Sequence, residues 1–214
     1  MRTDDLIDVL ARDASPVARG TVRRTLMIAM ACAAAVSLAI LLGWLGMRPD
    51  IHTAMRTMPF WMKATYTLTL AASGFWLTHR LARPDGRPGR AWALPLLVIA
   101  VLAGLSVIEL AGTPRADWRA LMMGHSWSLC PIRILAISAP VFALAMWTLR
   151  RLAPTRLMLA GAAAGLLAGG IGATVYGLAC DETAATFTLT WYTLAIGLSA
   201  GLGALLGRRL LAWR

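Results

Sequence analysis

The sequence predicts an all-α integral membrane protein: a bundle of six transmembrane helices with both termini in the cytoplasm. Hydrophobic residues fill 58% of the 214 positions and charged residues 14%, and the mean hydropathy is +0.66. A soluble domain of this length carries more charge and fewer apolar residues. The apolar residues gather in six runs, each about the 20 residues that cross a bilayer core. Arginines flank these runs, so the net charge of +11 does not indicate a nucleic-acid-binding patch.

Residues 1–24 precede the first apolar run and are predicted to form a cytoplasmic segment with one short amphipathic helix. Three aliphatic side chains share one face at helical spacing, and acidic side chains accompany them. The aliphatic residues are Leu6, Val9 and Leu10, and the acidic residues include Asp4, Asp5 and Asp13. A partner protein, the membrane surface or the protein's own cytoplasmic loops could cover the aliphatic face. Because membrane-surface helices usually have a basic polar face, we favour a partner protein.

Residues 25–207 are predicted to form the transmembrane domain, followed by a cytoplasmic tail at 208–214. The six spans cover residues 25–46, 60–81, 91–112, 131–149, 157–179 and 187–207. The second span is the least apolar, because Lys63, Ser73 and several threonines interrupt it. We expect Lys63 to extend outward from the helix end, as lysine side chains do near a membrane boundary.

The positions of the basic residues predict the orientation of the bundle. Fifteen of the 21 Lys and Arg residues flank the spans on the side that holds both termini, and six lie on the other side. Because cytoplasmic flanks are enriched in Lys and Arg, the side with fifteen is predicted to be cytoplasmic. The outward-facing loops are then those near residues 47–59, 113–130 and 180–186.

The last two spans carry glycines four residues apart, a spacing that lets helix backbones approach closely. These glycines are Gly161, Gly165 and Gly169 in the fifth span, and the pairs Gly197 with Gly201 and Gly203 with Gly207 in the sixth. We favour packing within one bundle over homodimerisation, and the sequence leaves the oligomeric state open.

Cys130 and Cys180 are the sharpest functional candidates. They lie at the outer ends of the fourth and fifth spans, which form a hairpin, so both are expected at the same outer level. Neighbouring helix axes lie about 8–10 Å apart, whereas a disulfide needs Cα atoms within about 7 Å. The spacing therefore allows a disulfide without requiring one. Cys32 lies in the middle of the first span and is interpreted as an ordinary small apolar residue.

Several chemistries fit this cysteine pair. On an oxidising outer side, two thiols can form a disulfide or a redox pair. Together with His125, Asp181 and Glu182 they could instead bind a thiophilic metal ion. Arg133 and the start of a helix lie close to Cys130, and both stabilise a thiolate. Two unrelated interfacial cysteines are the plainer alternative.

Glu109 lies about one turn inside the outer end of the third span. An acidic residue within a membrane is a functional candidate by default, but so close to a helix end its carboxylate could equally reach the interface. The sequence carries no zincin motif, nucleophile elbow or phosphate-binding loop. It therefore predicts neither an enzyme nor a bound cofactor, and a heavy-metal ion is considered only as a signal at the cysteine pair.

Several short motifs occur in order along nearly the whole chain. They are Thr3-Asp4-Asp5-Leu6-Ile7, Ala14-Ser15-Pro16-Val17, the segment 124–130, Cys180-Asp181-Glu182 and Trp191-Tyr192. Together with the six spans, these motifs resemble the NrsF-type membrane anti-sigma factors of proteobacteria. The resemblance implies a negative regulator that holds an extracytoplasmic-function sigma factor at the bacterial inner membrane and releases it under stress.

The resemblance matches Cys130 and Cys180 to the family's paired cysteines, and residues 4–17 to its cytoplasmic N-terminal segment. It implies that the pair senses the stress and that the N-terminal segment, with help from the inner loops, binds the sigma factor rather than nucleic acid. Two other classes compete. A membrane thiol oxidoreductase would normally need a CxxC motif or a second cysteine pair, and a small transporter or channel would need polar residues at mid-membrane.

Overall fold

The computed structural model describes residues 21–83, 86, 89–152 and 154–212, and within these ranges the chain is helical, without a β-strand. The long helices are α2 (Thr21–Trp44), α4 (Met58–Leu81), α5 (Ala93–Ala111), α7 (Cys130–Leu152), α8 (Leu157–Tyr176) and α10 (Thr193–Leu210). The connections contain the short helices α3 (Ile51–Ala54), α6 (Trp118–Met123) and α9 (Ala185–Phe187). They also contain two 3-10 turns, η1 (Gly89–Trp92) and η2 (Arg115–Asp117), and a π-helical turn, η3 (Thr188–Tyr192).

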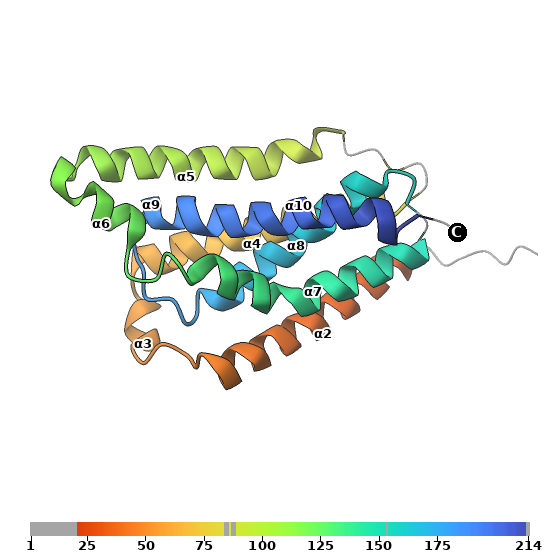
Figure 1. Cartoon of the computed structure of the whole chain (residues 1–214), viewed down its shortest axis with the longest axis horizontal. Helices are drawn as coiled ribbons and strands as arrows, with labels where there is room; N and C mark the ends of the chain where they lie inside the picture. The colour runs from red at the N-terminus through yellow and green to blue at the C-terminus, as the bar shows by residue number, and fades with distance from the viewer. Residues whose placement is uncertain (1–20, 84–85, 87–88, 153, 213–214) are drawn as a thin grey trace, which may run out of the picture.

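The long helices run side by side along the length of the molecule (Figure 1). One end of the bundle carries α3, α6 and the start of α9, and we call it the α3–α6 end. The start of α2 and the end of α10 both lie at the opposite end. α8 packs against α4, α7 and α10, whereas α5 lies along one edge of the bundle. α8 is therefore the central helix.

Glycines allow α8 to occupy this central position. A Cβ atom added at Gly165 would lie 2.2 Å from the carbonyl oxygen of Ser199 in α10, and one at Gly170 would lie 2.6 Å from the backbone nitrogen of Ala71 in α4. Neither contact leaves room for a side chain. The Ser199 hydroxyl also donates a hydrogen bond of 2.9 Å to the Gly165 carbonyl. The backbones of α8 and its neighbours are thus in direct contact, as small residues permit between membrane helices.

The predicted glycine packing is confirmed within the bundle at five positions and wrong at two. The first five, Gly161, Gly165, Gly169, Gly203 and Gly207, lie between α8 and α10. The other two are Gly197 and Gly201 on α10. Each of them is exposed, and an added Cβ atom would meet nothing within 4 Å. Their spacing matches the packing glycines, but the helix turns them away from α8.

Five helices in the described part of the chain are long and apolar enough to cross a membrane, one fewer than the sequence predicts. They cover Leu26–Trp44, Gly89–Ala111, Cys130–Leu152, Leu157–Tyr176 and Ala185–Leu210. The remaining segment, predicted at 60–81, does form the 24-residue helix α4. Lysine, serine and threonine side chains lower its hydropathy, and four of them are buried inside the bundle: Lys63, Thr67, Ser73 and Thr78.

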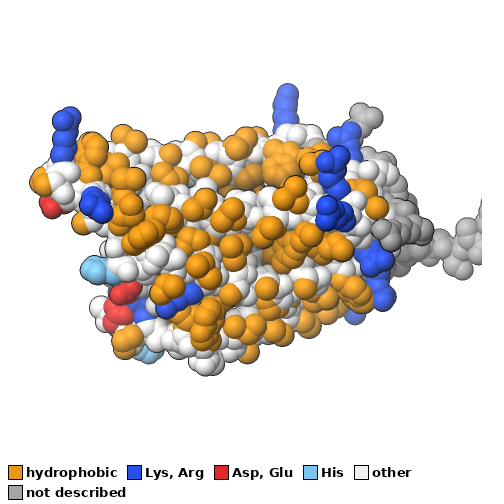
Figure 2. All heavy atoms as spheres, viewed as in Figure 1, with side chains coloured by type: hydrophobic (Ala, Val, Ile, Leu, Met, Phe, Trp, Pro, Cys, Tyr) orange, Lys and Arg blue, Asp and Glu red, His pale blue; other side chains and the backbone are white. Residues whose placement is uncertain are grey.

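The surface has the charge distribution of a membrane protein. On the face shown in Figure 2, hydrophobic side chains cover the middle of the molecule, and Lys and Arg side chains gather at its two ends. Acidic and histidine side chains on this face lie at the α3–α6 end alone. An apolar band between two charged ends is what a bilayer requires of a helix bundle.

The contact between α8 and α10 predicts a sharp difference between two glycines. Gly165→Val should lower the free energy of unfolding by about 1–3 kcal/mol or more, because the new side chain overlaps the Ser199 carbonyl. The matched control, Gly201→Val, should leave stability unchanged or slightly raised, because valine favours the helix more than glycine does. Thermal unfolding of the detergent-solubilised variants measures both. Equal losses in the two variants would contradict the α8–α10 packing.

Candidate functional site

The loop between α8 and α9, residues 177–184, is the centre of the candidate site. It leaves the central helix at the α3–α6 end and contains Cys180 and Glu182. Helix α4, the segment after α2 and the segment after α6 all bind this loop through hydrogen bonds, while α5 binds the start of α9 just beyond it. The site is therefore built from residues far apart in the sequence.

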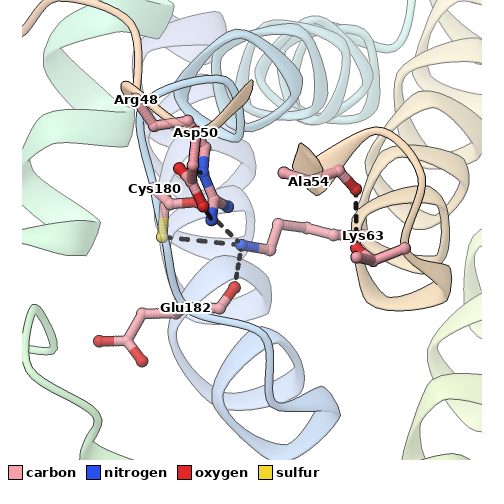
Figure 3. Close-up of polar contacts among 7 residues, drawn as sticks. Arg48, Asp50, Ala54, Lys63, Cys180 and Glu182 are labelled. Carbon is pink, nitrogen blue, oxygen red and sulfur yellow. Dashed lines mark hydrogen bonds and ion pairs between the residues drawn. The ribbon is translucent and has the colours of Figure 1, made fainter. Parts of the chain in front are cut away.

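Lys63, in the second turn of α4, reaches into this loop (Figure 3). Its side chain is only 4% exposed. The ammonium donates to the carbonyl oxygen of Cys180 at 3.5 Å, to the Cys180 sulfur at 3.7 Å and to the carbonyl oxygen of Glu182. It also lies 5.4 Å from the centre of the Tyr192 ring, within the range of a cation–π interaction.

The predicted outward extension of Lys63 is therefore wrong. The loop folds back over the start of α4 and supplies three acceptors, which match the three N–H donors of an ammonium group. A buried polar group is stabilised when its hydrogen bonds are satisfied, and here they are satisfied without solvent. Lys63 is the only lysine of the chain among 21 basic residues, a signal that could have singled it out.

Arg48 binds the same carbonyl from the other side. Its guanidinium donates to the Cys180 oxygen at 3.3 Å, and its backbone N–H donates to the Leu178 oxygen at 3.2 Å. Two further bonds of 2.7 Å join the guanidinium to the carboxylate of Asp50. These bonds lower the pKa of Asp50 below its ordinary value of 3.8 and raise that of Arg48. Cys180 is thus held by two cations through one carbonyl group.

Glu182 connects the loop to the segment after α6. Its carboxylate accepts hydrogen bonds from the backbone N–H groups of His125 at 2.6 Å and Ser126 at 3.2 Å. The chain approaches closely because Gly124 has a positive φ of 53°, and a Cβ atom there would lie 2.5 Å from the carboxylate. The acidic group therefore stabilises the turn ahead of α7.

The two cysteines are both buried and both free. Cys130 is 0% exposed at the start of α7, and Cys180 is 3% exposed in the loop. Cys130 begins α7 and Cys180 follows α8, so both lie toward the α3–α6 end of the bundle. Their free state shows that no disulfide joins them in this structure. Cys32 is exposed on α2, away from this cluster.

The predicted metal ligands do not assemble around the cysteines. Across residues 21–212, as far as they are described, no group of three His, Cys, Asp or Glu side chains could hold a metal ion. The His125 side chain is fully exposed, Asp181 is also exposed, and the Glu182 carboxylate is occupied by backbone N–H groups. Arg133 is half-buried and interacts with Tyr176. Of the suggested ligands, Glu182 is used by the backbone of the segment after α6, and His125 and Asp181 are exposed.

The π-helical turn η3 adds an aromatic wall to the site. It places Tyr192 beside Tyr176, with ring centres 5.9 Å apart, and under the ammonium of Lys63. Within the described structure the Tyr192 hydroxyl is buried without a hydrogen-bond partner. π-Helical turns are frequent at functional sites. Tyr176 was not identified from the sequence, and Tyr192 was noted only as part of the Trp191-Tyr192 motif, without a role at this site.

Glu109 holds the start of α9. Its carboxylate accepts hydrogen bonds from the N–H of Ala185 at 3.1 Å, the N–H of Thr186 at 2.8 Å and the Thr186 hydroxyl at 2.6 Å. A carboxylate at a helix N-terminus satisfies N–H groups that have no partner within the helix. Glu109 is therefore a structural anchor between α5 and α9.

The opposite end of the bundle is basic. Its described arginines follow or precede the long helices, and they are Arg24, Arg80, Arg83, Arg90, Arg150, Arg151, Arg156, Arg208 and Arg209. Arg151 stacks over the Trp147 ring at 4.0 Å. The predicted sigma-binding residues, Asp4, Asp5, Leu6, Val9, Leu10 and Asp13, lie outside the described residues.

Comparison with known proteins identifies relatives over the full length of the chain. The profile of a family described as NrsF, negative regulator of sigma F, matches residues 10–213. The chain is 40% identical over 214 residues to the anti-sigma-F factor NrsF of Caulobacter vibrioides (strain NA1000 / CB15N), which covers all of both chains. It is 37% identical over 216 residues to the probable anti-sigma-F factor NrsF of Azospira oryzae (strain ATCC BAA-33 / DSM 13638 / PS), again over all of both chains. No solved structure matches.

The anchoring role of Glu109 predicts a loss of stability when its charge is removed. Glu109→Gln should lower the free energy of unfolding by about 1–3 kcal/mol, because hydrogen bonds to a charged group are stronger than those to an amide. Asp117→Asn is the control, since Asp117 is an exposed acid at the same end of the bundle. Apparent melting temperatures of the purified variants provide the comparison. A Glu109→Gln variant as stable as the control would show that Glu109 does not anchor α9.

Proposed function

The chain belongs to the NrsF family of negative regulators of sigma F, and from that premise we propose that it binds sigma F at the bacterial inner membrane and releases it under stress. It is an anti-sigma-F factor, a regulatory protein and not an enzyme. The observation that carries the proposal is the 40% identity over the whole of both chains to a relative of that name. We take the partner to be an extracytoplasmic-function sigma factor.

We propose that the bundle spans the membrane six times, with both termini in the cytoplasm. α4 supplies the sixth span: its 24 residues extend about 36 Å at the usual helical rise, and it packs along α8. The buried hydroxyls of Thr67 and Ser73 donate to carbonyls of the same helix, whereas the buried Thr78 hydroxyl has no partner in the described structure. The α3–α6 end then faces outward and the arginine-rich end faces the cytoplasm, in agreement with the charge bias.

Reporter fusions test this topology. Green fluorescent protein fused after Arg83 should fluoresce and alkaline phosphatase fused there should be inactive, because α4 returns the chain to the cytoplasm. Fusions after Arg56, before α4, should give the reverse. An active phosphatase at both positions would show that α4 does not cross the membrane.

We propose that the N-terminal segment binds sigma F through the face formed by Leu6, Val9 and Leu10. A short amphipathic helix cannot bury such a face alone, and helix-in-groove binding is a common solution. The arginine-rich loops of the cytoplasmic end are proposed to contribute further contacts to the sigma factor. Binding by so small a segment is consistent with a bundle that carries little mass outside the membrane.

We propose that Cys130 and Cys180 sense the stress, as an oxidant or a thiophilic metal ion. Both thiols are buried toward the α3–α6 end of the bundle, which supports the proposal, and soft sulfur ligands suit such an ion. Both signals require the loop to open, because the two thiols are at most 3% exposed. Modification then changes how α7 and α8 pack and weakens sigma binding at the cytoplasmic end.

Co-purification tests the partner and the binding segment together. A sigma factor should co-purify with the tagged full-length protein, and deletion of residues 1–17 should abolish this while the deleted protein still reaches the membrane. Leu6→Ala/Leu10→Ala should weaken binding strongly, because these residues form the apolar contact. Retention of the sigma factor by the deleted protein would refute the proposed binding segment.

The same assay tests the sensor. Cys130→Ser and Cys180→Ser should keep the sigma factor bound and repressed, but stress should no longer release it. Cys32→Ser is the matched control and should respond like the unmodified protein, because Cys32 lies on the outside of α2. Normal release from both Cys130→Ser and Cys180→Ser would end the sensing proposal without affecting the assignment of the partner.

A further inference from the structure

Lys63 is unusual in a chain whose other 20 basic residues are arginines. An ammonium is compact and has three donors, whereas a guanidinium is planar and has five. The pocket around Lys63 offers three acceptors, which are two carbonyl oxygens and one sulfur. Cys180 and Glu182 contribute them (Figure 3). The geometry therefore fits lysine, whose three donors meet three acceptors.

The charge of Lys63 has no carboxylate partner in the described structure. The ion pairs there join Arg48 to Asp50 and His125 to Glu182, and the Glu182 carboxylate points away from Lys63 toward residues 125 and 126. A buried ammonium without an anion depends on its hydrogen bonds for stability. Any change at these acceptors therefore alters the hydrogen bonds that stabilise the Lys63 ammonium.

Lys63 also connects two parts of the molecule that the sensing proposal needs to join. On one side it contacts the sulfur of Cys180. On the other it belongs to α4, one continuous helix that ends at Leu81 at the arginine-rich end of the bundle. Any group attached to the Cys180 sulfur occupies space next to the ammonium, 3.7 Å away, and must displace one or the other.

We propose that Lys63 is the positioning residue that transmits the state of Cys180 to α4. In the unmodified protein its three hydrogen bonds fasten the 177–184 loop to the outer end of α4. Modification of the Cys180 sulfur expels the ammonium, frees the start of α4 and so changes the cytoplasmic end of that helix. This inference rests on the proposed role of Cys180 as a sensor, and it holds for either kind of signal.

The test uses Lys63 as its own reporter, because the chain contains no other lysine. The full-length protein, with Cys180 as its single cysteine, is placed in lipid nanodiscs and treated with an amine-acylating reagent. Mass spectrometry of the peptide that contains Lys63 gives the rate of labelling. Methyl methanethiolsulfonate then transfers its methylthio group to the Cys180 sulfur, with methanesulfinic acid leaving, and the labelling is repeated.

The unmodified protein should acylate Lys63 slowly, since the side chain is buried, and methylthiolation should raise the rate by about tenfold or more. Cys180→Leu should raise it similarly without any reagent, because leucine is bulkier than cysteine. Cys180→Ser, which keeps the size of the side chain, is the matched control and should leave the rate low. A rate that is the same in all four samples, or that is already fast in the unmodified protein, would overturn the inference.

Substitution of Lys63 provides an independent measurement. Lys63→Met keeps the length of the side chain but removes the donors, and it should release sigma F without stress while the protein remains at its normal level in the membrane. Lys63→Arg should do the same, because a planar guanidinium with five donors does not match the three acceptors. If both variants retain sigma F and still release it normally under stress, the role of Lys63 in transmission is refuted. If methylthiolation exposes Lys63 as expected but sigma F stays bound, the proposed sensing role of Cys180 is refuted, while the contact between Lys63 and Cys180 still stands.

Discussion

The close contact of α8 with its three neighbours determines the arrangement of the whole bundle. Glycines at the contacts with α4, α7 and α10 leave no room for side chains, so α8 is enclosed along its length. The chain that leaves its end therefore emerges in the middle of the α3–α6 end rather than at the rim. The 177–184 loop is partly buried for that reason, and its backbone N–H and C=O groups lose the solvent that loops normally bind.

Charged side chains supply hydrogen bonds that solvent would otherwise provide. Arg48 and Lys63 donate to loop carbonyls, and the carboxylates of Glu109 and Glu182 accept backbone N–H groups from neighbouring segments. Each of these hydrogen bonds joins residues that are distant in the sequence. The cluster of charges that resembles a metal or catalytic site is thus explained by the needs of the backbone. What it leaves unexplained is the pair of thiols enclosed at its centre.

The sequence predicted the helices well and their contacts poorly, for a physical reason. Each apolar run is a local property, and all six became long helices whose ends lie at two levels. The position of Lys63 depends on a loop residue 117 positions away, and Glu109 binds the start of α9, 76 positions away, which no local pattern records. The same limit explains why the packing predicted for Gly197 and Gly201 was wrong. Their spacing matches that of the packing glycines, but the arrangement of the bundle decides which face of α10 meets α8. Asp181 and His125 looked like ligands because sequence proximity cannot reveal that both side chains face solvent.

The proposed sensing role of the buried thiols requires surroundings that are stable and yet able to rearrange. The aromatic wall has both properties. Tyr176 and Tyr192 exclude water from the cysteines, but in the described structure the Tyr192 hydroxyl lacks a partner, and the π-helical turn that carries it departs from regular helix. A buried hydroxyl without a partner and a break in regular helix are both features that a local rearrangement can relieve. The ammonium beside Cys180 has no carboxylate partner in the described structure, so its place there depends on its hydrogen bonds to the loop. The α3–α6 end is therefore the part of the bundle in which we propose that a small change at one sulfur has the largest structural effect.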